Sequence, residues 1–368
     1  MKLKDLIESN NTGLDAIKRA PIVDYDTGVR CLRIGDISNN RPFNEWGYTE
    51  VEDNNYSKFQ LKTGDIIVAR TGATIGVNKY IDKDYKSVYN NGLIRIRVKK
   101  ENNPKYVYHL LQSTNYKNFI KTISMGTSTQ PNMQMNDLLN LEVPDFDKLT
   151  QDKIVEILGK IDDKIGLNNE INNNLYEEAV ALYKDKFKGI EQGEKTIGEY
   201  ILPKRGKNLL TRDAVEGEIP VVAGGLEPSA YHNQSNTKSP VITISASGAN
   251  AGYTNLWNIP VWASDCSYID ESITKNVNFW YIVLKTRQNE IFDAQTGSAQ
   301  PHIYPQHIAE MPIDVLNDDE VEKYNTLVES LFKMIGNNKT ENIKLSQLRD
   351  ALLPKLMNGE IDLDNIEI

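Results

Sequence analysis

The chain has few of the side chains that hold metals or form disulfides. Its 368 residues include 2 cysteines and 4 histidines, with no His-x-Glu or Cys-x-x-Cys spacing that would build a metal site. Cys31 and Cys266 alone make no disulfide framework, so we expect a reducing, cytoplasmic environment. No metal site and no catalytic set is predicted.

Long apolar runs are missing as well. No stretch approaches the roughly 18 residues that span a bilayer, and residues 1–8 lack the apolar core of a signal peptide. The length instead predicts two or three globular domains, each with a core of its own.

Basic residues are outnumbered by acidic ones. The chain carries 42 basic and 51 acidic residues, a net charge of −9. By segment, the balance is +2 for residues 1–147, −1 for 148–190, and −5 each for 191–314 and 315–368. Bulk charge therefore does not predict a nucleic-acid binder, although a local basic face stays open.

The sequence also contains no complete catalytic motif of the kinds considered next. No Gly-Lys-Ser/Thr completes a nucleotide-binding loop, and no Asn-Pro-Pro-Tyr-like tetrapeptide of an amino-methyltransferase is present. Asp145 with Asp162, Asp163 and Lys164 formally resembles a metal-dependent nuclease signature, but the last three lie on a predicted helix and not on a strand beside Asp145. The sequence thus predicts a binding protein, with a self-sufficient nuclease as the weakest alternative.

What the chain does have is a long internal repeat. Gly-Thr-Ser-Thr-Gln-Pro at residues 126–131 corresponds to Gly-Ser-Ala-Gln-Pro at 297–301, and the helix behind each copy matches at a shift of 170 residues. The matching pairs include Ile165 with Ile335, Leu175 with Leu345, Leu182 with Leu352, and Gly189 with Gly359. Solenoid periods are far shorter. The repeat predicts a duplicated domain with its own helix, and a partner that is also two-fold.

We therefore expect four segments: a mixed domain at 1–147, a long helix at 148–190, a second mixed domain at 191–314, and a second long helix at 315–368. Strands are predicted at 65–70, at 93–98 (half-exposed) and at 240–245, whereas the apolar run at 279–284 fits either a strand or a helix. The fold class is α+β, with the two long helices expected to pack as an antiparallel coiled coil.

The two helices carry the spacing of a coiled coil. Apolar positions recur at alternating steps of four and three from Ile154 to Leu182, and again from Tyr324 to Leu352. Asn168 and Asn172 interrupt the first seam, and Asn338 and Asn342 interrupt the second. In an antiparallel pair the four amides would meet and fix the register. The alternative is a solvated stretch where the helices splay, and either way we expect the two helices to pack together.

Each mixed domain also carries two polar loops. Glycine-rich loops at 70–76 and 246–252 follow strands, and amide and hydroxyl side chains fill 126–132 and 297–302. Such groups can bond phosphates and base edges. The purely structural alternatives are a strand-to-strand turn for the glycine-rich loops and a capped loop before a helix for the other two segments. The candidate DNA contacts are Arg70, Thr71, Gly72, Thr74, Thr127, Ser128, Thr129, Gln130 and Asn132 in the first domain, and Ser245, Ser247, Asn250, Ser298, Gln300 and His302 in the second.

Basic residues add candidate phosphate contacts. These are Arg95 and Arg97 in the first domain and Lys204, Arg205 and Lys207 in the second. For each of them a solvated surface position is an equally good interpretation.

Taken together, the chain resembles the specificity subunit of a type I restriction–modification system over essentially its whole length. The resemblance is carried by the two half-similar domains, the loop at 70–76, the Thr-Gln-Pro segment at 129–131 with its Ala-Gln-Pro copy at 299–301, and the string Leu-Leu-Pro-Lys-Leu-Met-Asn-Gly-Glu-Ile at 352–361. In the first copy the counterpart of that string, at 182–189, is degenerate.

The resemblance implies that the chain is a non-catalytic DNA reader. Each domain would read one half of a bipartite, asymmetric site, and the helices would set the spacing between the halves and dock two methyltransferase subunits. Those subunits would bring S-adenosylmethionine, and restriction subunits joining them would bring ATP and magnesium, so this chain is expected to need no cofactor. The alternative of another class is a duplicated protein-binding scaffold with a coiled-coil docking rod.

Overall fold

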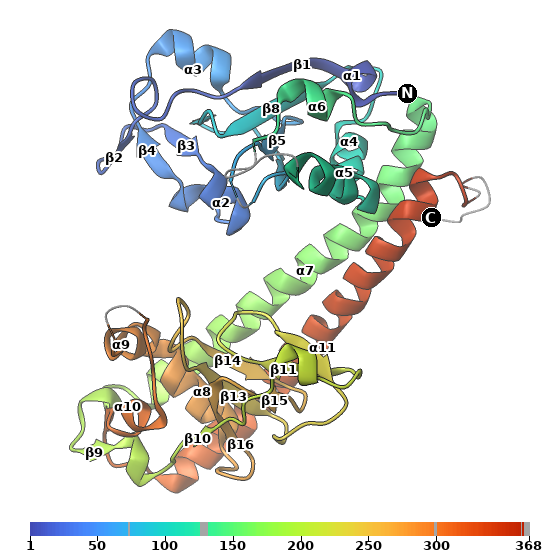
Figure 1. Ribbon diagram of the computed structural model, residues 1–368. Helices are drawn as coiled ribbons and strands as arrows, with labels where there is room; N and C mark the ends of the chain where they lie inside the picture. The colour runs from blue at the N-terminus through green and yellow to red at the C-terminus, as the bar shows by residue number, and fades with distance from the viewer. Residues whose placement is uncertain (73, 126–131, 298–299, 362, 364–368) are drawn as a thin grey trace. The chain divides into compact units, whose positions relative to one another are not determined.

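A computed structural model describes residues 1–72, 74–125, 132–297, 300–361 and 363. The chain divides into two compact units. Unit 1 comprises Met1–Asp163 with Leu345–Ile368, and unit 2 comprises Lys164–Lys344. Each unit therefore contains one end of each long helix, α7 (Lys148–Lys186) and α11 (Asp318–Met357) (Figure 1).

Unit 1 contains two four-stranded sheets. One, in the order β1-β8-β5-β6, is antiparallel, and the other, in the order β2-β4-β3-β7, has one parallel pair, β3 with β7. The strands are β1 (Ile7–Thr12), β2 (Ile22–Val23), β3 (Arg30–Leu32), β4 (Gly47–Thr49), β5 (Ile66–Ala69), β6 (Asn78–Tyr80), β7 (Ser87–Tyr89) and β8 (Leu93–Val98). The predicted strands at 65–70 and 93–98 are β5 and β8.

Short helices cover the first of these sheets. They are α1 (Leu3–Leu6), α4 (Pro104–Leu110), α5 (Thr114–Met125) and α6 (Met135–Leu139), whereas α2 (Ile34–Ser38), α3 (Asp53–Phe59) and the 3-10 turn η1 (Phe43–Glu45) contribute to the core around β3 and β7. Asn103 caps α4 by accepting from the backbone N–H of Lys105 at 2.9 Å, and Pro104 opens its first turn. The core joins β5 and β8 to these helices and to Ile154 and Leu158 of α7.

Unit 2 repeats this plan. Its sheets have the orders β10-β16-β13-β14 and β12-β11-β15, with a small pair β17-β9. The strands are β9 (Lys195–Thr196), β10 (Lys204–Arg205), β11 (Ile219–Val222), β12 (Ala230–His232), β13 (Val241–Ser245), β14 (Thr254–Trp257), β15 (Trp262–Ala263), β16 (Cys266–Asp270) and β17 (Pro312–Ile313). Between β11 and β15 the pairing is again parallel, so β12-β11-β15 corresponds to β4-β3-β7 of unit 1.

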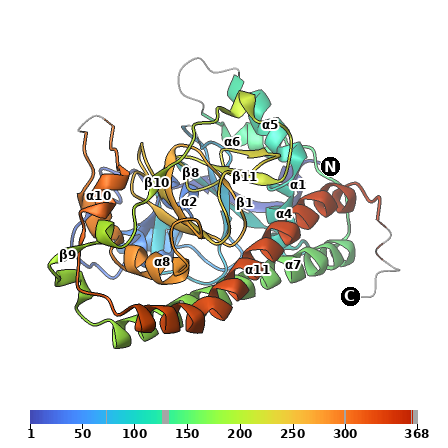
Figure 2. The ribbon, with the colours of Figure 1, turned by 90° about the horizontal axis from the view of Figure 1, so that it is seen from below.

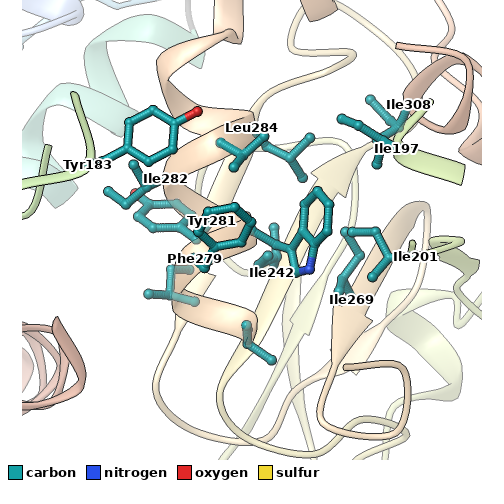
Figure 3. Packing of buried hydrophobic residues seen from close by; sticks show 14 of the residues in the cluster. Tyr183, Ile197, Ile201, Ile242, Ile269, Phe279, Tyr281, Ile282, Leu284 and Ile308 are labelled. Carbon is teal, nitrogen blue, oxygen red and sulfur yellow. The ribbon is translucent and has the colours of Figure 1, made fainter. Parts of the chain in front are cut away.

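The ambiguous apolar run at 279–284 is helical. It forms the middle of α8 (Val277–Thr286), which is followed by α9 (Gln288–Asp293) and α10 (Pro305–Ala309), with 3-10 turns η2 (Ile190–Gln192), η3 (Ile197–Glu199) and η4 (Thr211–Asp213). Every residue of α8 up to Leu284 is buried, because the helix lies between β13 and β16 on one side and the ends of α7 and α11 on the other (Figure 3). A helix that is enclosed all round loses the amphipathic period that would have identified it.

Within each unit the long helices pack side by side and antiparallel (Figures 1 and 2). In unit 1, Arg349 of α11 bonds Asp162 of α7 at 2.8 Å. In unit 2, the Tyr324 hydroxyl of α11 donates to the Ala179 carbonyl of α7 at 2.8 Å. The residue numbers fall along one helix as they rise along the other, which confirms the antiparallel pairing expected from the sequence.

The four asparagines meet across the seam of unit 2. Asn338 Nδ2 donates to Asn172 Oδ1 at 2.9 Å, and Asn168 Nδ2 donates to Asn342 Oδ1 at 2.9 Å. Asn168 is only 1% exposed. The alternative of a splayed, solvated stretch is therefore wrong.

Replacing one amide of the Asn172–Asn338 pair should lower the stability of the chain. Asn338→Leu leaves the buried Asn172 without its donor, and the free energy of unfolding should fall by about 1–2 kcal/mol. The double variant Asn172→Leu/Asn338→Leu should recover most of this loss, because both polar groups are then gone. Chemical denaturation of the variants measures both effects, with the exposed Asn173→Leu as the control for helix propensity. A double variant as unstable as the sum of the two single variants would contradict the pairing.

Candidate nucleic-acid interface

The two glycine-rich loops are the same structure. In unit 1 the loop at 70–76 joins β5 to β6, and in unit 2 the loop at 246–252 joins β13 to β14. Gly76 N–H donates to Ala69 O at 2.8 Å, and Gly252 N–H donates to Ser245 O at 2.7 Å. The backbone of each loop is therefore a strand-to-strand turn, the structural alternative given above. The two turns are similar enough to hold their side chains in equivalent positions.

Glycine has two different roles in each turn. Gly72 and Gly248 have φ of 83° and 81°, and a Cβ added at either position would meet no heavy atom within 4 Å, so backbone conformation alone calls for glycine. At Gly76 a Cβ would lie 2.8 Å from Ile120, so close packing also requires it. The first glycine of the turn thus faces open space, and the last faces the core.

In both units the second polar segment lies against the glycine turn. In unit 1, Thr71 forms a β-bridge with Asn132, and Met133 N–H donates to Arg70 O at 2.8 Å. In unit 2, Ser247 bridges His302, and Ile303 N–H donates to Ala246 O at 2.9 Å. We call each juxtaposition the paired loops: residues 70–76 with Asn132 in unit 1, and residues 246–252 with 300–302 in unit 2.

Several predicted contacts fall outside the described residues. These are Thr127, Ser128, Thr129 and Gln130 in the first segment and Ser298 in the second. Gln300 is described and exposed, and Thr71, Gly72, Thr74 and His302 are partly exposed at the paired loops.

In unit 1 the side chains at the paired loops form an arginine–amide pair. Arg70 Nε and Nη2 donate to Asn132 Oδ1 at 3.3 and 3.1 Å. The two residues are 62 positions apart, so their pairing could not be read from sequence spacing.

In unit 2 the corresponding side chains are unlike. Ser247 donates through Oγ to Asp265, which also forms an ion pair with Arg205. The His302 ring stacks on Tyr304 with centroids 6.1 Å apart, and Tyr304 is 47% exposed. Asp265 and Tyr304 were not predicted as site residues, and no motif in the sequence marks either one.

Two of the predicted contacts in unit 2 serve the fold. Ser245 is buried and donates through Oγ to the Gly224 carbonyl at 3.1 Å, and Asn250 Nδ2 donates to the same carbonyl at 3.4 Å. They tie the turn to the preceding loop. Lys204 and Lys207 are exposed, with Lys204 Nζ 3.2 Å from Ser272 Oγ, so both stay candidates for phosphate.

The expectation of a half-exposed β8 needs correction. Arg95 is 5% exposed, and its Nη1 donates to the carbonyls of Lys58 and Gln60 at 3.2 and 3.3 Å. Burial lowers its pKa. The alternation of Ile and Arg suggested a solvent face, but Arg95 instead donates to carbonyls at the C-terminal end of α3 inside the unit. Arg95 is therefore removed from the candidate interface.

Arg97 is also engaged internally. Its Nε donates to Asp65 Oδ1 at 2.7 Å, and this hydrogen bond raises the pKa of the guanidinium. The Asp65 side chain is 2% exposed while that of Arg97 is 32% exposed. The charge of Arg97 is thus used to hold a buried carboxylate.

We therefore expect Arg97→Gln to act on stability. Leaving Asp65 buried without its partner should lower the free energy of unfolding by about 1–3 kcal/mol, reduced from the cost for a fully buried pair because Arg97 is partly solvated. Lys4→Gln removes an exposed charge from the same unit. It should change the free energy of unfolding by less than about 0.5 kcal/mol. Unaltered thermal unfolding together with weaker DNA binding would instead make Arg97 a phosphate contact.

Two of the four nuclease-like residues pair with the facing helix, and one of them, Lys164, forms an ion pair with Glu341 at 3.4 Å. Asp162 lies on α7 and pairs with Arg349 of α11. Over residues 1–72, 74–125, 132–297, 300–361 and 363, no group of three or more His, Cys, Asp or Glu side chains is placed to hold a metal ion. Within the same ranges no helix is both long and apolar enough to cross a membrane.

Comparison with known proteins points to one family. A family model described as the type I restriction modification DNA specificity domain matches residues 1–177. The type I restriction enzyme MjaIX specificity subunit of Methanocaldococcus jannaschii is 25% identical over 303 residues, covering 71% of this chain and 70% of that protein. The HindI specificity subunit of Haemophilus influenzae is 23% identical over 434 residues, covering 90% and 94%.

The fold agrees with these matches. The crystal structure of a type I restriction–modification S subunit from M. genitalium aligns over 97% of this chain and 95% of that one, with a TM-score of 0.56 and 20% identity. Residues 1–177 thus match the type I restriction modification DNA specificity domain, and the chain as a whole is similar to type I specificity subunits. The resemblance expected from the sequence is thereby confirmed, as is the α+β fold with two repeated domains and two long antiparallel helices.

Proposed function

We propose that this chain reads a bipartite, asymmetric DNA site, with the paired loops of each unit contacting one half. The observation that carries the proposal is the repetition of one loop backbone with different side chains. Unit 1 presents Arg70 and Asn132 where unit 2 presents Ala246 and His302. A shared frame suits the same kind of ligand, and unlike side chains suit unlike base pairs.

We propose further that α7 and α11 set the half-site spacing and dock two methyltransferase subunits. Two helices that repeat each other offer two similar surfaces to two copies of one partner. Leu327 and Met334, one heptad apart on α11 in unit 2, are 49% and 51% exposed, and Leu167 of α7 is 52% exposed. Exposed apolar side chains one heptad apart lie on the same face of a helix, where they can form part of a protein–protein contact.

The partner subunits would supply the chemistry. S-adenosylmethionine and the extrusion of the target adenine would belong to the methyltransferases, and ATP and magnesium to restriction subunits, all in the cytoplasm. The −5 balance of residues 191–314 and of 315–368 favours DNA binding that depends on positive charge from these partners.

A gel-shift measurement tests this division of labour. The chain with its methyltransferase subunit should bind a duplex carrying the methylated motif much more tightly than a scrambled duplex, and the chain alone should bind both weakly. A complex that assembles but binds both duplexes equally, at every salt concentration, would favour the scaffold alternative.

A further inference from the structure

Arg70 is held in place more firmly than a surface arginine. Its backbone N–H donates to Gly92 O at 3.0 Å, and its carbonyl accepts from Met133 N–H, so the main chain is fixed from both sides at the end of β5. The side chain therefore leaves a rigid base at the first position of the glycine turn.

Asn132 orients the guanidinium but does not neutralise it. One edge of the group, Nε with Nη2, donates to Asn132 Oδ1. An arginine has five N–H donors in a planar fork, so three remain, including those along the Nη1–Nη2 edge. Because the amide of Asn132 carries no charge, the full positive charge stays available.

This arrangement differs from that of two other arginines among the candidate contacts. Arg97 is paired with Asp65 and Arg205 with Asp265. In the described part of the chain, no carboxylate lies within ion-pair distance of Arg70. Gly72, two residues further on, has open space beside it. The guanidinium is thus oriented, charged and beside an open part of the turn.

We propose that Arg70 reads a guanine in the half-site of unit 1, donating from its free edge to O6 and N7, with Asn132 as the positioning residue. A planar fork matches these two acceptors in the major groove, and this is the commonest specific arginine contact to DNA. The inference rests on the proposed function. In unit 2 the equivalent residue is Ala246, which is 1% exposed, so that position supplies no such contact.

Replacement of single guanines by 7-deazaguanine tests the contact, because it removes N7 alone. In duplexes carrying the methylated motif, each guanine is replaced in turn, and binding by the complex with the methyltransferase is measured. For one guanine the wild-type complex should lose about 10- to 100-fold in affinity. Arg70→Lys keeps the charge but loses the fork, so it should erase this penalty while keeping its affinity for a scrambled duplex.

Two further variants complete the test. Asn132→Ala should shrink the same penalty, since the guanidinium is no longer oriented. Arg41→Lys, at a half-exposed arginine of the same unit that pairs with Asp36 at 3.5 Å, should leave it unchanged. Thermal unfolding of each variant checks that unit 1 is intact.

Two results with 7-deazaguanine would overturn the inference: a motif in which no guanine shows the penalty, or a penalty that persists in Arg70→Lys. A third would be an Arg70→Ala variant that weakens binding equally on all sequences and has a salt slope smaller by about one. That result marks a phosphate contact. A wild-type complex that does not distinguish the motif from the scrambled duplex would instead refute the proposed function itself.

Discussion

A chain with one extra heptad in each long helix should direct methylation to the same two half-sites with a spacer about three base pairs longer. Seven helical residues add about 10 Å, and base pairs are stacked about 3.4 Å apart. The insertions belong beside Asp162 in α7 and Arg349 in α11, which are bonded to each other, so that the added turns face one another. Sequencing of methylated DNA from cells carrying the variant gives the spacer length directly.

The control is the same heptad placed in α7 alone. It leaves the added turns of α7 without a partner on α11 and shifts the Asn172–Asn338 pairing out of register, so we expect little methylation at any defined site. An unchanged spacer in the double-insertion chain would show that the helices do not set the distance between the half-sites.

Unit 1 should lose roughly 2–4 kcal/mol of stability on acidification from about pH 7 to pH 4, through His109. This residue of α4 is 5% exposed, and burial lowers the pKa of its imidazole to about 4, with Asp162 opposing the shift and Arg349 and Lys105 adding to it. In the unfolded chain the imidazole binds a proton below its ordinary pKa of about 6.5. Between these two values the unfolded state holds more protons, so stability rises with pH and is lost as pH falls.

His109→Gln isolates this contribution. The difference in unfolding free energy between the wild-type chain and the variant should shrink between pH 7 and pH 4, because the variant has no imidazole to protonate on unfolding. Denaturation curves at a series of pH values measure it. Parallel pH profiles would contradict the burial of a neutral imidazole.

The parts of the fold that follow from periodicity could be predicted from the sequence. The helices α7 and α11 begin at Lys148 and Asp318, 170 residues apart as the repeat requires, and the asparagine pairs follow from matching positions on antiparallel helices. Residues 279–284 could not be assigned, because a helix buried on every side shows no polar face.

The loops of the candidate site could be predicted from the sequence, but their pairing could not. Glycine and amide patterns identified both loops, since local turn chemistry is written in local sequence. Their juxtaposition depends on bridges between distant residues, such as Thr71 with Asn132. For the same reason Arg95 was misassigned: its partners are backbone carbonyls more than thirty residues away, and nothing in the alternation of β8 distinguishes an internal arginine from a solvated one.

We propose above that one chain reads two unlike half-sites through one repeated loop backbone. Long-read sequencing of N6-methyladenine tests it most directly, in a host without adenine methylation that expresses this chain with its methyltransferase subunit. We expect a single motif of two different short sequences separated by a spacer of fixed length and free composition, and we expect methylation of this motif to vanish when this chain is omitted. A continuous motif, a palindromic one, or methylation that persists without this chain would contradict it.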